Sequence, residues 1–274
     1  SRTHRRRPSR QIVFREVSCD AAPTTITHAY TMKVIILTTS ADKMGDHPTG
    51  AWSEEITGPY YAFVDAGADV TIASVSGGPV PIDAGSLSDA FKTENDKRFE
   101  SSGDISKLET SVPLSSVEVG ELDILFLAGG HGTCADFADG AVPKLVTDAY
   151  AAGKVVGAVC HGPTGLVNAK DGDKPLVAGK KIAAFSDVEV GAGGPSAAAH
   201  STPEASSAPL PQEGQVQLTE KVPFLLEAKM KELGAEYVPS EPWSENAIAD
   251  GKLVTGQNPQ SSVKCAKLCL EAAK

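Results

Sequence analysis

Aromatic residues, cysteines and long apolar runs are all scarce in this sequence of 274 residues, and each scarcity excludes a class of protein. No run approaches the roughly 18 consecutive apolar residues of a membrane-spanning helix, so we expect a soluble protein without a membrane partner. The five cysteines contain no Cys-x-x-Cys pair and no dense framework, which favours free thiols in a reducing, cytoplasmic compartment. Acidic side chains outnumber basic ones by 35 to 25, which argues against a nucleic-acid partner.

The first 31 residues differ in composition from the rest of the chain. Six of the seven arginines lie there, beside many serines and threonines and only two acidic residues. Such a basic, acid-poor leader is typical of an organelle transit peptide. The alternative, which we favour, is a translated upstream segment with Met32 as the true start. Residues 32–274 carry a net charge of −14 and form the folded domain.

From Lys33 onward, short apolar runs alternate with longer helical stretches. This alternation predicts an α/β fold, a flavodoxin-like parallel sheet sandwiched by helices, with functional groups at the carboxyl ends of the strands. The expected strands are 34–37, 69–74, 123–128, 155–159, 181–185 and 253–255, with helices at 54–66, 142–152 and the C-terminus. Cys265 and Cys269, four residues apart, should share one face of the last helix, where we favour core packing over metal or redox work.

Residues 190–212 interrupt this pattern, because 17 of the 23 are Ala, Ser, Pro or Gly. Such a composition cannot build a packed face, so one expectation is a low-complexity surface loop. The other is a retained intron, whose removal would join Glu189 directly to Glu213.

Cys160 follows the apolar run 155–159 and precedes His161-Gly162-Pro163. A buried strand that ends in a nucleophile and a tight turn resembles a nucleophile elbow. We expect a following helix N-terminus to favour the thiolate and lower the thiol pKa. The alternative is a buried structural cysteine, but the adjacent histidine favours nucleophilic catalysis.

Several ordered motifs together resemble the ThiJ/PfpI superfamily, of the class I glutamine-amidotransferase-like fold. They are Thr49-Gly50-Ala51-Trp52-Ser53-Glu54-Glu55 with Pro59-Tyr60-Tyr61, Ala66-Gly67-Ala68-Asp69-Val70, Pro81-Ile82-Asp83, Gly129-Gly130-His131-Gly132, Ala158-Val159-Cys160-His161-Gly162-Pro163 and Thr255-Gly256-Gln257-Asn258-Pro259. The resemblance runs from Met32 to the C-terminus, and it is strongest to the glyoxalase III (D-lactate dehydratase) branch. Relatives commonly dimerise, so a homodimer is one expectation.

The resemblance implies that Glu55 contacts the cysteine and exchanges protons with a bound carbonyl. On a helix its neighbour Glu54 would point away, and the alternative for both glutamates is that their charge complements a helix N-terminus. His161 is the expected proton shuttle, oriented by an acid that follows the fifth strand. Asp187, Glu189 and Glu213 are the candidates for that acid. The superfamily places it five positions after the strand-ending Phe185, where this chain has Val190; removing 190–212 would put Glu213 there.

Gly129 and Gly130 can turn backbone N–H groups toward an oxyanion, with the His161 N–H as a second donor. His131 either reaches substrate or caps this loop.

The leading functional hypothesis is an enzyme that converts methylglyoxal or a similar 2-oxoaldehyde to a 2-hydroxy acid through a covalent bond to Cys160. It needs no metal, glutathione or other cofactor. The alternatives are deglycation of proteins or nucleotides, a stress-response chaperone or redox sensor that uses the same cysteine, and, more remotely, a peptidase.

Overall fold

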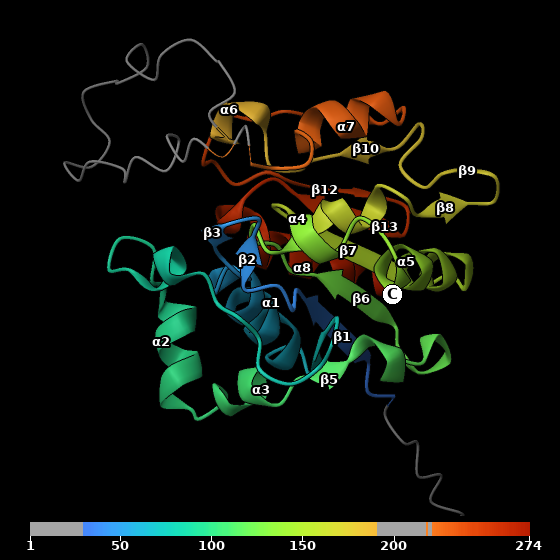
Figure 1. Ribbon diagram of the computed structural model, residues 1–274. Helices are drawn as coiled ribbons and strands as arrows, with labels where there is room; N and C mark the ends of the chain where they lie inside the picture. Colours follow the sequence, from blue (N-terminus) through green and yellow to red (C-terminus); the bar gives the residue numbers. More distant parts are fainter. Residues whose placement is uncertain (1–29, 191–217, 219–220) are drawn as a thin grey trace, which may run out of the picture. The chain divides into compact units, whose positions relative to one another are not determined.

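A seven-stranded sheet forms the centre of the protein in the computed structural model, which describes residues 30–190, 218 and 221–274 (Figure 1). Almost all of the leader and the low-complexity segment therefore lie outside the described residues. The strands in sheet order are β12 (Ala247–Asp250), β13 (Leu253–Gly256), β7 (Val155–Val159), β6 (Ile124–Leu127), β1 (Lys33–Thr38), β4 (Asp69–Ser74) and β5 (Val112–Pro113).

Helices and three short strand pairs surround this sheet. The helices are α1 (Glu54–Val64), α2 (Glu94–Ser101), α3 (Ser106–Glu109), α4 (Thr133–Asp136), α5 (Ala141–Ala151), α6 (Asp187–Val190), α7 (Leu226–Glu232) and α8 (Ser262–Ala273). The pairs are β2 (Lys43–Met44) with β3 (His47–Pro48), β8 (Lys170–Asp171) with β9 (Lys174–Pro175), and β10 (Lys181–Ile182) with β11 (Glu236–Tyr237). No helix in the described part of the chain is long and apolar enough to cross a membrane.

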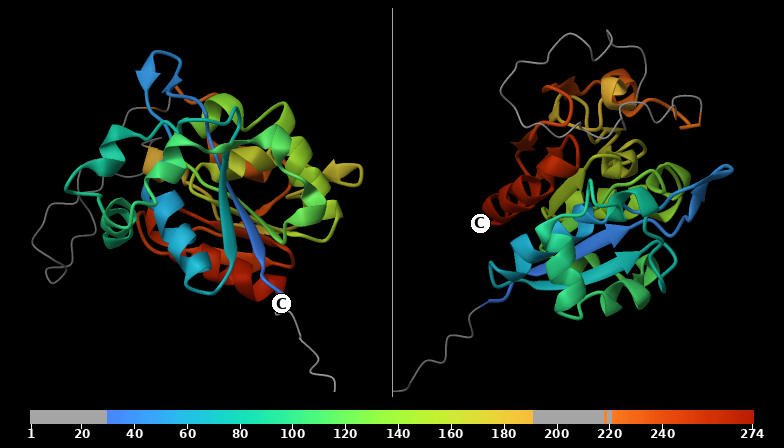
Figure 2. Two further views of the ribbon diagram at one scale, coloured as in Figure 1. Left: turned by 90° about the horizontal axis from the view of Figure 1, so that it is seen from below. Right: turned by 90° about the vertical axis from the view of Figure 1, so that its left-hand side faces the viewer.

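The two faces of the sheet are covered by different helices, as Figure 2 shows. Helices α1 and α8 pack against each other and against β1 and β7, while α5 packs on β7 from the opposite side. The apolar strands alternate their side chains between these two layers: Ile36 belongs to the cluster under α1 and α8, and Leu37 to the cluster under α5. This two-sided burial explains why the strands are apolar throughout.

The sequence predicts most of this architecture correctly. Strands 69–74 and 155–159 have the expected bounds, and the pairings of β1 with β4 and β6, and of β7 with β6 and β13, are parallel. The expected fifth strand, 181–185, is wrong in length and in place, because β10 covers only Lys181–Ile182 and pairs with β11 outside the main sheet. The short edge strand β5 and the strand β12, which runs antiparallel to β13, were not predicted.

Gly157 allows β7 and α8 to approach each other closely. A Cβ atom at this position would lie 2.6 Å from the Cys269 sulfur and 2.7 Å from a ring carbon of Phe126. Cys265 and Cys269 are both fully buried on the sheet-facing side of α8, so the prediction that they are core residues is confirmed.

We expect Gly157→Ala to lower the free energy of unfolding by about 1–3 kcal/mol, because the added methyl group overpacks this layer. Urea denaturation measures the change. Cys269→Ala removes the closer of the two obstructing atoms, so the double variant should be more stable than the sum of the single changes predicts. Gly120→Ala is the matched control, since its Cβ would meet nothing within 4 Å; strict additivity of the two core substitutions would contradict this account.

Candidate active site

Cys160 lies at the carboxyl end of β7 in a backbone conformation that is rare for a residue with a side chain. Its φ is 58°, a left-handed value that costs of the order of 1–3 kcal/mol in a non-glycine residue. Hydrogen bonds from both sides hold it there: its N–H donates to the Gly256 carbonyl (3.0 Å), and its own carbonyl accepts from the Phe185 N–H (3.0 Å). The predicted nucleophile elbow is therefore present and is fixed by two neighbouring segments.

The turn after Cys160 packs directly against the end of β6. Gly162 begins a short 3₁₀ helix (Gly162–Leu166), and a Cβ atom there would lie 2.3 Å from the Leu127 carbonyl oxygen. The Thr133 hydroxyl donates to the carbonyls of Gly130 (2.8 Å) and His161 (3.1 Å), at the two neighbouring strand ends. The glycine loop after β6 and the turn after β7 are thereby joined.

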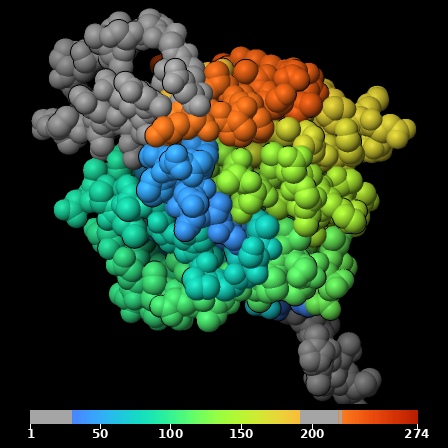
Figure 3. Space-filling model, viewed as in Figure 1, coloured from blue at the N-terminus to red at the C-terminus, as the bar shows by residue number. Residues whose placement is uncertain are grey.

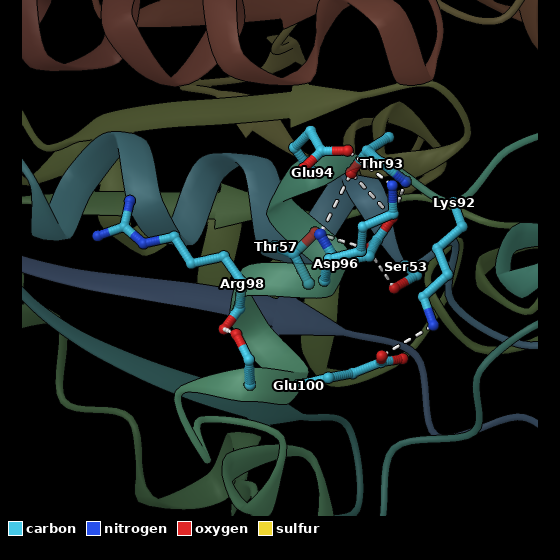
Figure 4. A network of polar contacts seen from close by, with 10 residues as sticks. Ser53, Thr57, Lys92, Thr93, Glu94, Asp96, Arg98 and Glu100 are labelled. Atoms are coloured by element: carbon cyan, nitrogen blue, oxygen red, sulfur yellow. Dashed lines mark hydrogen bonds and ion pairs between the residues drawn. The ribbon is translucent and has the colours of Figure 1, made fainter.

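Glu55 comes from the first turn of α1, and polar contacts with α2 anchor that turn (Figure 4). The Asp96 carboxylate accepts hydrogen bonds from the hydroxyls of Ser53 (2.6 Å) and Thr57 (2.8 Å) in and next to α1. It also accepts the Thr93 N–H (2.8 Å), which closes the capping box of α2. The position of Glu55 therefore depends on a buried carboxylate that fastens two helix starts together.

A small cavity of about 20 Å³ is lined in part by Cys160 and is large enough for about one water molecule. Its lining residues are Trp52, Glu55, Gly130, His131, Cys160, Phe185, Trp243 and Pro259. A larger outer hollow of about 560 Å³ shares Trp52 and His131 with it and reaches the β2–β3 hairpin, which lies on the surface in Figure 3.

Burial controls the protonation of Cys160 and Glu55, which are 5% and 0% exposed. Burial raises the pKa of Glu55 well above its usual range, and the nearby Cys160 thiol and Gly129 N–H lower it only in part. Burial, followed by the charge of Glu55, also raises the pKa of Cys160 well above that of a free thiol. The expected fall in the thiol pKa is therefore wrong, because desolvation outweighs the His161 N–H, the backbone donor that favours the thiolate.

His161 is placed to accept the thiol proton. Its Nδ1 atom lies 3.6 Å from the Cys160 sulfur, and its ring packs against those of His131 (centroids 4.3 Å apart) and Phe185 (4.7 Å). Burial lowers its pKa well below the usual value, and the proximity of His131 lowers it further. The pKa of His131 is itself lowered to about 4, mainly by burial. Burial thus favours the uncharged form of the thiol, the carboxyl group and the imidazole alike.

The DJ-1/PfpI family model matches residues 48–194, more than half of the chain. The chain belongs to the DJ-1/PfpI family.

Relatives and solved structures agree with this membership. The chain is 30% identical to Glyoxalase 3 of Candida albicans over 226 residues, which cover 80% of this chain and 87% of the relative. It is 33% identical to the probable glutathione-independent glyoxalase hsp3103 of Schizosaccharomyces pombe over 257 residues, 81% and 89% of the two chains. The crystal structure of glyoxalase III from Candida albicans matches with a TM-score of 0.73 and 28% identity, over 88% of this chain and 97% of the other. The Rapid Encystment Protein of 24 kDa from Francisella tularensis matches with a TM-score of 0.75 and 32% identity, over 89% and 100%.

The DJ-1/PfpI fold brings Cys160, His161, Glu55 and the Gly129–Gly130 loop together, as the sequence predicts. Gly129 lies against both the Glu55 carboxyl group and the His161 N–H, because a Cβ atom there would be 2.3 Å and 2.8 Å from them. Neither oxygen of this buried carboxyl group has a hydrogen-bond partner by distance and angle within the described residues, so the carboxyl group faces the Gly129 loop with unfilled polar atoms. His131 lines the cavity wall and therefore lies where it can reach substrate.

The three candidate acids lie in different surroundings. Asp187 donates its backbone N–H to Glu227 in α7 (3.0 Å). Glu189 is 1% exposed, and both of its oxygens accept hydrogen bonds from groups other than His161. Glu213 lies outside the described residues and stays a prediction, and Val190, the position the family pattern gives to the acid, is buried at the end of α6.

Four lining residues were not among the predicted site residues: Trp52, Phe185, Trp243 and Pro259. Trp52 and Pro259 stand within the motifs that carry the family resemblance, so their positions were a usable signal. Trp243 is one of only two tryptophans in a chain poor in aromatic residues, and its φ of 62° is again left-handed. Its loop has no periodic pattern that would place it in the site.

Glu54 points away from Cys160, as expected, and enters the contact between α1 and α2. It accepts hydrogen bonds from the Thr93 hydroxyl and the Asn95 side-chain amide (3.2 Å), and it is 8% exposed. Burial, partly opposed by the Thr93 bond, raises its pKa to about 7.

The pKa of Glu54 predicts a pH dependence of stability. Because the folded value, about 7, exceeds the unfolded value of 4.5, the folded state binds more protons between these pH values, and stability falls as pH rises through this window. We expect the pH-dependent decrease in the free energy of unfolding to be smaller in Glu54→Gln, by up to about 3 kcal/mol at pH 8 and by little at pH 4. Urea unfolding at both pH values measures this, with exposed Glu109→Gln as the control. Equal pH slopes for the Glu54→Gln variant and the native protein would refute the assignment.

Proposed function

We propose that this protein is a glutathione-independent glyoxalase that converts methylglyoxal and similar small 2-oxoaldehydes to 2-hydroxy acids such as D-lactate. The observation that carries the proposal is the Glu55 carboxyl group, fully buried against the Cys160 thiol, with the neutral His161 ring 3.6 Å from the sulfur. The names of the relatives, several of which are glutathione-independent glyoxalases, support the same reaction.

The first step is addition of the Cys160 sulfur to the aldehyde carbon. His161 Nδ1 takes the thiol proton as the carbon–sulfur bond forms, and the Glu55 carboxyl group gives its proton to the carbonyl oxygen. The product is a hemithioacetal, with a charged pair in place of the neutral resting groups. Because Glu55 and His161 are both buried, this pair is stabilised mainly by mutual attraction and by nearby backbone N–H groups.

The second step moves a proton between the two oxidised carbons. The Glu55 carboxylate removes the proton from the former aldehyde carbon, and an enediol forms. The protonated His161 gives its proton to the ketone oxygen as this enediol forms, and so becomes neutral again. Glu55 then returns its proton to the neighbouring carbon while the hydroxyl proton of the sulfur-bearing carbon passes to His161, which gives a thioester of Cys160. Water hydrolyses the thioester, so the net reaction adds one water to the oxoaldehyde and regenerates the thiol. No metal or second thiol enters the sequence.

Redox sensing by Cys160 has less support from the same contacts. A sensor cysteine needs an accessible thiolate with a low pKa, whereas burial raises the pKa of this thiol.

Methylglyoxal turnover in the absence of glutathione tests the proposal. We expect the purified full chain to form D-lactate, Cys160→Ala to form none, and Glu55→Gln to lose about 10²–10⁴-fold in kcat/KM because it cannot exchange a proton. An enzymatic lactate assay measures all three proteins.

Cys134→Ala is the matched control, because this buried cysteine lies outside the inner cavity and belongs to a separate cluster with Met44. It should retain native turnover. A native chain that forms no lactate, or a Cys160→Ala variant as active as the native chain, would reject the proposed reaction.

A further inference from the structure

Glu189 is the most densely hydrogen-bonded carboxylate near the site, although it touches neither Cys160 nor His161 through any of these bonds. Its Oε2 atom accepts from the Ser186 N–H (3.0 Å), the Ser186 hydroxyl (2.8 Å) and the Gln257 side-chain amide (3.2 Å). Its Oε1 atom accepts from the Trp243 N–H (2.8 Å) and the Asn258 side-chain amide (2.9 Å). Five donors around one carboxylate account for its nearly complete burial.

These donors come from three separate segments, and each segment supplies one residue to the cavity wall. Ser186 follows Phe185, Trp243 is itself a lining residue, and Asn258 precedes Pro259. Glu189 is therefore linked to three of the eight lining residues: directly to the Trp243 backbone, and to Phe185 and Pro259 through their neighbours Ser186 and Asn258.

Trp243 depends most strongly on this carboxylate. Its left-handed φ of 62° is unfavourable for a bulky residue, and its N–H donates to Glu189. Phe185, by contrast, has a second anchor, because its N–H donates to the Cys160 carbonyl (3.0 Å). The two rings meet edge to face with centroids 5.6 Å apart, so Trp243 closes the wall that begins with His161 and Phe185.

We propose that Glu189 is a positioning residue that holds Trp243 and Pro259 in the substrate-facing wall and so sets substrate affinity. It is not the acid that orients His161. Wall residues contact the substrate in the ground state and in the transition state alike, so loosening them should raise KM and leave kcat nearly unchanged. Loss of an acid that orients His161 would lower kcat instead.

Glu189→Gln tests the proposal, which rests on the proposed glyoxalase reaction for its kinetic arm. The amide keeps the shape but presents an NH₂ group to one set of donors. We expect KM for methylglyoxal to rise about tenfold, with kcat within about threefold of the native value. Glu241→Gln, an exposed glutamate two residues before Trp243, is the matched control and should change neither constant.

A second measurement is independent of turnover. In a Trp52→Phe background, Trp243 is the only tryptophan, so acrylamide quenching of its fluorescence reports its exposure directly. We expect Glu189→Gln to increase the quenching constant at least twofold. If Glu189→Gln does not fold, Ser186→Ala removes one of the five donors and should move KM and quenching in the same direction by less.

A fall of 100-fold or more in kcat with unchanged KM and unchanged quenching would overturn the proposal and return Glu189 to the role of orienting acid. Unchanged kinetics together with unchanged quenching would overturn it as well. A native chain without methylglyoxal turnover would reject the proposed reaction, and the quenching result would then decide the positioning role alone.

Discussion

The burial of an acid and a thiol in one small cavity, with no cation beside them in the described part of the chain, is the constraint on which the site depends. Desolvation is the largest cause that favours the protonated form of both groups, since each charged form would lose its hydration without gaining a counter-ion. The neutral state is also the useful one. Glu55 can donate a proton only while it holds one, and His161 can accept one only while its ring is neutral.

Contacts with the rest of the fold hold these groups in conformations that they would not adopt by themselves. The strained backbone of Cys160 is fastened to β13 and to Phe185, so its conformation is imposed by neighbours on both sides. The carboxylate of Asp96 does the same for the first turn of α1, and Glu189 for the opposite wall. Two buried carboxylates that take no part in the chemistry thus fix the two sides of the cavity.

Much of this could be predicted from the sequence. Apolar runs such as 69–74 and 155–159 mark buried parallel strands because both faces of the sheet are covered, and the cysteine and glycine motifs mark the carboxyl edge. The thiol pKa was mispredicted because the local argument counted backbone donors and not the loss of water, which depends on segments distant in sequence. Trp243 and the hydrogen bonds of Glu189 escaped prediction for the same reason: they arise where three loops without periodicity meet.

All four cysteines within the described residues are buried, but behind barriers of different kinds. Cys160 is separated from solvent only by the side chains of a cavity wall, whereas Cys265 and Cys269 lie between α8 and the sheet. A thiol reagent should therefore label these cysteines at two different rates. The labelling rate of Cys160 reports local opening of the cavity wall. The labelling rates of Cys265 and Cys269 report the partial unfolding in which α8 separates from the sheet.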